Sequence, residues 1–148
     1  MATVNGCDLP EDVFYNLEKH TWARLLDDGT VRLGMTSVAG KLAGGTLAAV
    51  TVSARKVGKE IAAGKSVATV ESSKYVGPVP TPVSGTLLRG NDRLVNEPNL
   101  AVSDPYGDGW IAEMTPSDWD GESPALPSGA AGVAAYQAWL EAEGVSCT

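Results

Sequence analysis

The sequence contains very few of the residues that enzymes use for catalysis or for metal binding. Its 148 residues include one histidine, His20, and two cysteines, Cys7 and Cys147, which allows neither a histidine cluster nor a zinc-type cysteine spacing. No serine lies in a nucleophile-elbow motif, and the three glycines within residues 40–45 lack a phosphate-loop pattern. We therefore expect a protein without catalytic residues or a metal site of its own.

Positive charge and long apolar runs are also scarce. The chain has 11 Lys and Arg against 18 Asp and Glu, which gives a net charge of −7 and a pI of about 4.6. This balance argues against nucleic acid or an anionic membrane as a partner. No apolar run reaches the roughly 18–20 residues of a membrane span, and the N-terminus lacks a signal-peptide core. We expect a cytoplasmic monomer that binds other proteins transiently.

The apolar residues fall into short runs that are rich in β-branched side chains and separated by turn residues. The runs at 30–35, 46–53, 66–70 and 83–88 are predicted strands. Pro78, Pro80 and Pro82 place the segment before the last run at a sheet edge or in a connector, because proline cannot donate to a strand ladder. Many short strands at this spacing indicate a mostly β single domain, either a small sandwich or a flattened barrel.

Helices are predicted only at the two ends of the chain. Residues 10–18 begin with Pro-Glu-Asp, which suits the first turn of a helix, and residues 130–143 have apolar side chains at helical spacing. Between core and helix, residues 120–129 are rich in Pro, Gly and Ser and are predicted to be a linker. Residues 145–148 are expected to form a mobile tail.

Lys74 carries the functional prediction. It lies sixteen residues after Gly58 and eleven before Gly85, a spacing that suits the tip of a hairpin whose strands are bounded by glycine turns. A single lysine is usually a solvated surface charge. An exposed, positioned lysine without catalytic neighbours is also typical of a modification site, and acylation would create a swinging arm with a reach of about 10–15 Å. The hairpin residues around it are Glu71, Ser72, Ser73 and Tyr75.

Two other segments are assigned structural roles. His20 stands near Trp22, and we expect it to be packed and hydrogen-bonded and not to act as a catalyst. Residues 104–110 are rich in carboxylates but lack the alternating acidic ligands of a calcium loop. They are predicted to form a tight turn before a strand.

An ordered series of segments resembles the H protein of the glycine cleavage system, a lipoyl-carrying relative of the biotinyl/lipoyl domains. The series spans residues 20–118, about two-thirds of the chain. Its members are His-Thr-Trp at 20–22, Gly-Thr-Val-Arg-Leu-Gly-Met-Thr at 29–36, Val-Gly-Lys-Glu at 57–60, Val-Glu-Ser-Ser-Lys at 70–74, Pro-Val-Ser-Gly at 82–85, the turn at 104–110 and Pro-Ser-Asp at 116–118.

The resemblance implies a hybrid barrel-sandwich of two small antiparallel sheets with peripheral N- and C-terminal helices. It also implies that lipoate is attached to Lys74 by a lipoate-protein ligase or lipoyl transferase. The loaded arm would rest on the protein's own surface between visits to client enzymes. The chain would then be a carrier without turnover of its own.

Several departures from the H-protein pattern bear on what the arm carries. Glycine-cleavage H proteins usually have Glu where this chain has Thr21, Val and Ala beside the lysine where it has Ser73 and Tyr75, and Glu-Leu-Pro in place of part of residues 52–56. We interpret these changes as a cluster around the arm and its docking face.

With Ser-Lys-Tyr-Val-Gly-Pro-Val-Pro at 73–80, the chain is similar to the lipoate-binding proteins of the heterodisulfide-reductase-like sulfur-oxidation system. That resemblance implies a dithiol that carries sulfur intermediates to a heterodisulfide-reductase-like complex. The alternative is glycine cleavage, with an aminomethyl cargo and the glycine cleavage enzymes as partners.

Three questions stay open at this point. Cys7 and Cys147 are candidate redox residues, since a thiol in a mobile tail could exchange with a dithiolane, but they are equally well explained as two incidental free thiols. A biotin carrier is an alternative, although Met-Lys-Met would then be expected around Lys74. An unmodified structural subunit with a degenerate hairpin is another.

Overall fold

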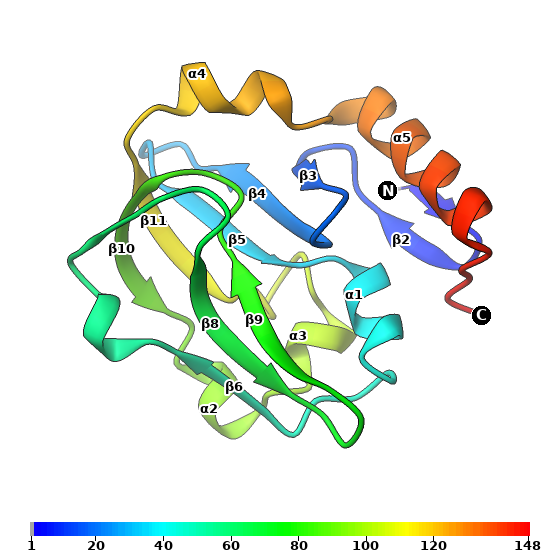
Figure 1. Cartoon of the computed structure of the whole chain (residues 1–148), viewed down its shortest axis with the longest axis horizontal. Helices are drawn as coiled ribbons and strands as arrows, with labels where there is room; N and C mark the ends of the chain where they lie inside the picture. The colour runs from blue at the N-terminus through cyan, green and yellow to red at the C-terminus, as the bar shows by residue number, and fades with distance from the viewer. Residues whose placement is uncertain (1) are drawn as a thin grey trace.

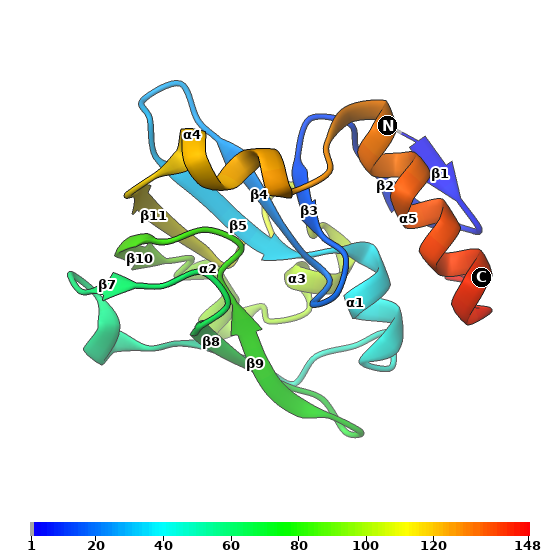
Figure 2. The ribbon, with the colours of Figure 1, turned by 45° about the horizontal axis from the view of Figure 1, so that its top comes forward.

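Antiparallel strands form the framework of the computed structural model, which describes residues 2–148 (Figures 1 and 2). The strands are β1 (Ala2–Val4), β2 (Cys7–Leu9), β3 (Phe14–Asn16), β4 (Thr21–Leu25), β5 (Val31–Met35), β6 (Ala49–Val52), β7 (Glu60–Ile61), β8 (Ser66–Glu71), β9 (Val76–Pro80), β10 (Gly85–Gly90) and β11 (Ala112–Pro116). The helices are α1 (Ser37–Leu42), α2 (Arg93–Asn96), α3 (Leu100–Ser103), α4 (Trp119–Glu122) and α5 (Gly129–Glu143), with 3₁₀ turns η1 (Ala54–Lys56) and η2 (Ser123–Ala125).

Two principal sheets face each other. A six-stranded sheet has the order β3-β4-β5-β11-β10-β7, and a three-stranded sheet has the order β6-β8-β9. A third, two-stranded sheet of β1 and β2 lies beside α5 at the end of the molecule where both termini are found (Figures 1 and 2). The predicted mostly β, antiparallel sandwich is confirmed, and β9 with its prolines is an edge strand as expected.

The main core fills the space between the two principal sheets. Leu33 and Met114 point into it from the large sheet, and Val67, Val70 and Val79 point into it from the small one. Burying each such side chain is worth about 1.5–3 kcal/mol relative to leaving it in water. The same apolar contacts therefore hold the β8–β9 hairpin against the large sheet.

A second apolar cluster lies under α5. Tyr136 and Leu140 are four residues apart on one face of the helix, and both are fully buried against Tyr15 and Trp22. The helix ends at Gly144, whose left-handed φ of 66° suits glycine. Among the described residues, no helix is long and apolar enough to cross a membrane.

The N-terminal helix predicted at residues 10–18 is wrong. Residues 14–16 form strand β3, which pairs with β4 in the large sheet. Val13 and Tyr15 are both fully buried while Phe14 between them is only half-buried, an alternation of period two that belongs to a strand. The Pro-Glu-Asp start favoured a helix locally, but packing against β4 decides the conformation.

The prediction of a linker at residues 120–129 is also wrong, because this segment is folded and packed on the large sheet. This segment contains the end of α4 and all of η2, and Leu126 packs with Trp119 on a small cluster beside the large sheet. Glu122 fastens it by accepting hydrogen bonds of 2.8 Å from both the backbone N–H and the hydroxyl of Ser84. The Pro- and Ser-rich composition produced short capped turns that pack on the sheet.

The tail at residues 145–148 is not free. The backbone N–H of Cys147 donates a 2.9 Å hydrogen bond to the carbonyl of Asn5, and its side chain forms a disulfide with Cys7. The expectation of a mobile tail is therefore corrected, and of the two readings left open for the cysteines, the one with two free thiols is wrong. Because both chain ends lie beside α5, residues at opposite ends of the sequence meet in space.

The two glycines that bound the hairpin region should respond differently to substitution. Gly58 has a φ of +84° and open space where a Cβ would lie, so Gly58→Ala should cost about 1–2 kcal/mol and Gly58→Asn less, since Asn tolerates this conformation. At Gly85 a Cβ would collide with the backbone carbonyl of Thr115, so Ala and Asn should both cost about 2–3 kcal/mol. Urea unfolding measures all four; a Gly85→Ala protein as stable as wild type would contradict the packing argument.

Candidate functional site

Lys74 lies at the tip of the hairpin formed by β8 and β9, which projects from one end of the molecule (Figure 1). The turn is held by Ser72, whose N–H donates a 2.7 Å hydrogen bond to the carbonyl of Tyr75. The Ser72 hydroxyl oxygen in turn accepts from the backbone N–H of Lys74 at 3.3 Å. Ser73 and Lys74 are exposed, so the tip is fixed in its backbone and open at its amine.

The strands below the tip restrict how it can move. Val70 pairs with Gly77 and Glu71 with Val76 in register, directly beneath the turn. β8 is the central strand of its sheet and also pairs with β6, so only the four-residue turn projects beyond the ladder. Glu71 is exposed at the end of β8, three residues before Lys74.

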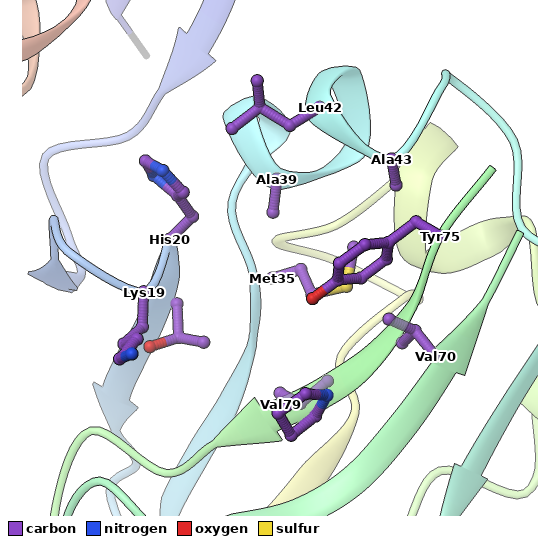
Figure 3. A pocket seen from close by; sticks show the side chains of 11 residues that line it. Lys19, His20, Met35, Ala39, Leu42, Ala43, Val70, Tyr75 and Val79 are labelled. Atoms are coloured by element: carbon purple, nitrogen blue, oxygen red, sulfur yellow. The ribbon is translucent and has the colours of Figure 1, made fainter.

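A small apolar hollow of about 160 Å³ lies next to this tip. Its size is close to that of the ~150 Å³ protein cavity that accepts benzene, which is enough for a small ring or a short acyl segment. The hollow lies between the hairpin, α1 and the start of β4 (Figure 3). Its lining residues are Lys19, His20, Thr21, Met35, Ala39, Leu42, Ala43, Val70, Tyr75, Pro78 and Val79.

Tyr75 and Lys74 connect the hairpin tip to the hollow. The ring of Tyr75 reaches from the hairpin toward Met35 and α1 (Figure 3). Gly77 makes room for this ring, because a Cβ there would collide with the Tyr75 hydroxyl. The stem of Lys74 passes Gly44, with its Cδ 3.8 Å from where a Cβ of that residue would lie. The stem of Lys74 therefore lies close to the residues that follow α1.

His20 is packed and hydrogen-bonded, as predicted. Its Nδ1 lies 2.6 Å from the hydroxyl of Tyr136, and its ring makes an edge contact with Trp139 at 4.5 Å. The same hydroxyl lies 2.8 Å from Oγ1 of Thr36, the N-cap of α1. Burial lowers the pKa of His20, which favours the neutral ring that can accept from Tyr136. The Tyr136 hydroxyl of α5 thus contacts both the histidine at the rim of the hollow and the N-cap of α1.

Thr21 has an unusual environment on the same rim. It is only 1% exposed, and its Oγ1 is buried without a hydrogen-bond partner among the described residues. A buried hydroxyl without a partner costs about 1–3 kcal/mol. Within residues 2–148, none of the residues that line the hollow is acidic, and Lys19 is a cation.

The remaining sequence predictions are distributed over the molecule. Thr21, Ser73 and Tyr75 do lie around the tip and the hollow, but residues 52–56 do not: η1 lies at the far end of β8, where Lys56 Nζ donates to the carbonyl of Ser66. The interpretation of all departures as one cluster is corrected for that segment. Residues 104–110 form turns before β11, as predicted, and the described residues contain no cluster of His, Cys, Asp or Glu that could hold a metal.

Sequence reasoning missed α1, which supplies one wall of the hollow. The signal was present in Thr36, which caps the helix by accepting from the N–H of Ala39 at 3.3 Å, and in the paired Gly44 and Gly45 after its end. The glycines drew attention to a phosphate loop instead. Leu42, 53% exposed on this helix, is part of the apolar surface next to Lys74.

The fold and this site together define a class of protein. A β-sandwich presents an exposed lysine at a hairpin tip beside an apolar hollow, and the described part of the chain contains no cluster of His, Cys, Asp or Glu that could hold a metal. The fold and the site are therefore those of a mostly β protein that displays a lysine amine on a fixed hairpin turn.

Comparisons with known proteins give the family. The model of the glycine cleavage H-protein family matches residues 14–135. The chain is 41% identical over 151 aligned residues to glycine cleavage system H protein 5 of Aquifex aeolicus, which covers 99% of both chains. It is 43% identical over 111 residues to the glycine cleavage system H protein of Mycobacterium leprae, covering 75% of this chain and 81% of the relative.

Structural comparison agrees with the sequence relationship. The crystal structure of a glycine cleavage system H protein from Mycobacterium marinum superposes with a TM-score of 0.73 at 31% identity, covering 93% of this chain and all of the other. The chain belongs to the glycine cleavage H-protein family of lipoyl carriers. Proteins of this family carry covalently attached lipoate and have no catalytic activity of their own.

The buried histidine predicts a pH dependence of stability. Because the pKa of His20 is lowered in the folded state, the unfolded chain binds the proton more readily, and the free energy of unfolding should fall as pH drops from about 7 to about 5. His20→Asn keeps a residue that tolerates the observed φ of 58° and removes the titration. Urea titrations at several pH values should give a shallower slope for the variant; parallel curves would show that His20 does not contribute.

Proposed function

We propose that Lys74 is the lipoyl attachment site and that the chain is a monomeric cytoplasmic carrier of lipoyl-bound intermediates. The proposal rests on the exposed amine at a tip that Ser72 and the flanking strands hold in place. The lipoate that proteins of this family carry would supply the chemistry of the carrier, because a dithiolane can be opened and reclosed by thiol–disulfide exchange. A lipoate-protein ligase or lipoyl transferase would recognise the exposed hairpin face formed by Glu71, Ser73 and Tyr75.

The hollow beside the tip is suited to hold the arm between visits to client enzymes. The lysine stem lies near Gly44, and Met35, Leu42 and Val79 offer an apolar lining. Acylation removes the charge of the lysine, which lowers the cost of laying it on such a surface. The clients that the relatives' names support are the glycine cleavage enzymes, which would place an aminomethyl group on the arm.

A second candidate cargo is favoured by the charge of the hollow. An aminomethyl group is cationic at neutral pH, and a carboxylate would be its natural partner. The lining residues that the structure describes include Lys19 but no carboxylate, and Thr21 occupies the position where glycine-cleavage H proteins usually have Glu. A neutral or anionic cargo, such as a sulfur intermediate bound for a heterodisulfide-reductase-like complex, fits this lining better.

Replacement of the lysine tests the carrier proposal. Lys74→Arg keeps the charge but cannot be lipoylated, so it should abolish the lipoyl mass on the peptide that contains residue 74 and all carrier-dependent flux, with unchanged thermal stability because the tip is exposed. Lys65→Arg, at another exposed lysine, is the matched control. A Lys74→Arg protein that still supports flux would refute the proposal, and a streptavidin-reactive or unmodified wild-type protein would favour the biotin carrier or the structural subunit.

The cargo can be read from the native protein. Mass spectrometry of the Lys74 peptide without reductant, from cells grown on glycine or on a reduced sulfur compound, separates the two candidates. Loading that depends on glycine, with an added aminomethyl group, supports glycine cleavage. Additional sulfur on the lipoyl arm supports sulfur transfer.

Thr21 offers a further test of how the hollow selects its cargo. Thr21→Glu supplies a carboxylate next to the resting arm, and a charge-assisted hydrogen bond of about 1.5 kcal/mol should raise the retention of an aminomethyl cargo by about tenfold. Thr21→Gln, similar in size and neutral, is the control. Equal lifetimes of aminomethyl-loaded wild type, Glu and Gln variants would show that the charge at residue 21 does not select the cargo.

A further inference from the structure

The disulfide between Cys7 and Cys147 joins two residues that are 140 positions apart in the sequence. Their Cα atoms lie 5.0 Å apart, where β2 and the segment after α5 run next to each other. Nothing in the carrier role described above uses this bond. Its surroundings, however, make its two sulfur atoms chemically unequal.

Burial distinguishes the two cysteines. Cys7 is fully buried in the cluster under α5, whereas Cys147 is only half-buried and belongs to the short segment after Gly144. A thiolate that approaches from solvent would therefore reach the sulfur of Cys147 first. Cys7 would then be the leaving group, because attack on one sulfur of a disulfide expels the other.

Besides the disulfide, the segment that carries Cys147 is held by hydrogen bonds to Leu140 and Asn5, the first from the N–H of Val145 at 3.0 Å. The backbone N–H of Cys147 donates to the carbonyl of Asn5 at 2.9 Å, and the Ser146 hydroxyl donates to the same carbonyl at 3.1 Å. Val145 packs at the edge of the cluster. When the disulfide opens, residues 145–148 are free to fray. Fraying lowers the effective concentration of one thiol near the other and so favours the reduced state.

We propose that Cys7 and Cys147 form a second redox couple that exchanges electrons with dihydrolipoyl dithiols. One thiolate of the dithiol attacks Cys147 Sγ, the Cys7–Cys147 bond breaks, and Cys7 leaves as a thiolate and takes up a proton. The second thiol of the dithiol then attacks the lipoyl sulfur of the mixed disulfide. This closes the dithiolane and releases Cys147 as a thiol. Two electrons pass from the dithiol to the cysteine pair, and no other reactant is needed.

Helix α1 connects this couple to the hairpin site. Cys147 Sγ lies 4.0 Å from the carbonyl oxygen of Ser37, the first residue of α1, while Leu42 at the other end of the helix lines the hollow beside Lys74. Six residues at 1.5 Å each make this helix about 9 Å long. The couple therefore lies one short helix away from the place where a lipoyl arm would rest, which is why a dithiol of this class is its reaction partner.

The inference rests on the proposed lipoyl arm only for the source of the dithiol, so the test uses free dihydrolipoamide on the Lys74→Arg protein. After incubation with dihydrolipoamide in about tenfold excess over lipoamide, acid quenching and alkylation, most molecules should carry label on both Cys7 and Cys147. Intact mass before treatment should be two hydrogens lighter than the thiol form. A pair that stays oxidised in the folded protein and is reduced only in denaturant is a structural cross-link, and this would overturn the proposal.

Single-cysteine variants test the assigned roles of the two sulfurs. Cys7→Ser leaves the thiol of Cys147 accessible, and it should form a mixed disulfide with oxidised lipoamide at least about tenfold faster than Cys147→Ser, in which only the buried Cys7 remains. Circular dichroism and thermal unfolding of both variants establish that each is folded. Equal rates in two folded variants would contradict the order of attack, while a failure of Lys74 lipoylation would leave both measurements unchanged.

Discussion

The arrangement of the site depends on the hydroxyl group of one buried tyrosine. Tyr136 comes from α5, near the end of the chain, and its hydroxyl meets both His20 before β4 and Thr36 at the start of α1. Burial raises the pKa of this phenol, so it remains neutral and can donate to His20 while it accepts from Thr36. Through this atom a peripheral helix fixes two of the elements that surround the hollow. The N–H of Thr36 also donates a 3.0 Å hydrogen bond to the carbonyl of His20, so the tyrosine hydroxyl adds α5 to a contact that the backbone already makes.

The tip of the hairpin that carries Lys74 is fixed in place although it is exposed to solvent. The buried valines of β8 and β9 fasten the strands from below, and Ser72 closes the turn with its own backbone and hydroxyl. Pro78 and Pro80 lie in the edge strand, where a missing N–H leaves no broken ladder and discourages pairing with another chain. Tyr75 and Val76 can therefore be exposed to solvent. The prolines keep the strand edge beside them from pairing with another chain.

The strands of the sandwich and the lysine at the hairpin tip were predictable from sequence because both leave local signals. Alternating β-branched residues and glycine turns mark β5, β8 and β10, and small residues around Lys74 mark the tip. The ends of the chain were not predictable in the same way. Residues 10–18 have a helical start, but residues 14–16 form β3, because Tyr15 packs in the cluster under α5 and no local pattern reveals that partner. The meeting of Cys7 and Cys147 likewise depends on how two terminal elements pack, which sequence spacing does not encode.

The bond between Cys7 and Cys147 also changes the chain's covalent topology. With this cross-link in place, residues 7–147 form a closed ring. A single cut by a protease in any exposed loop of the ring therefore opens it without releasing a fragment, and both sides of the cut stay attached through the sulfur bridge. An oxidised molecule that has been nicked once can keep its two sheets paired and its hairpin in place, whereas a reduced one can separate into two pieces. The oxidation state of this cysteine pair thus decides whether the protein keeps its fold after a single proteolytic cut.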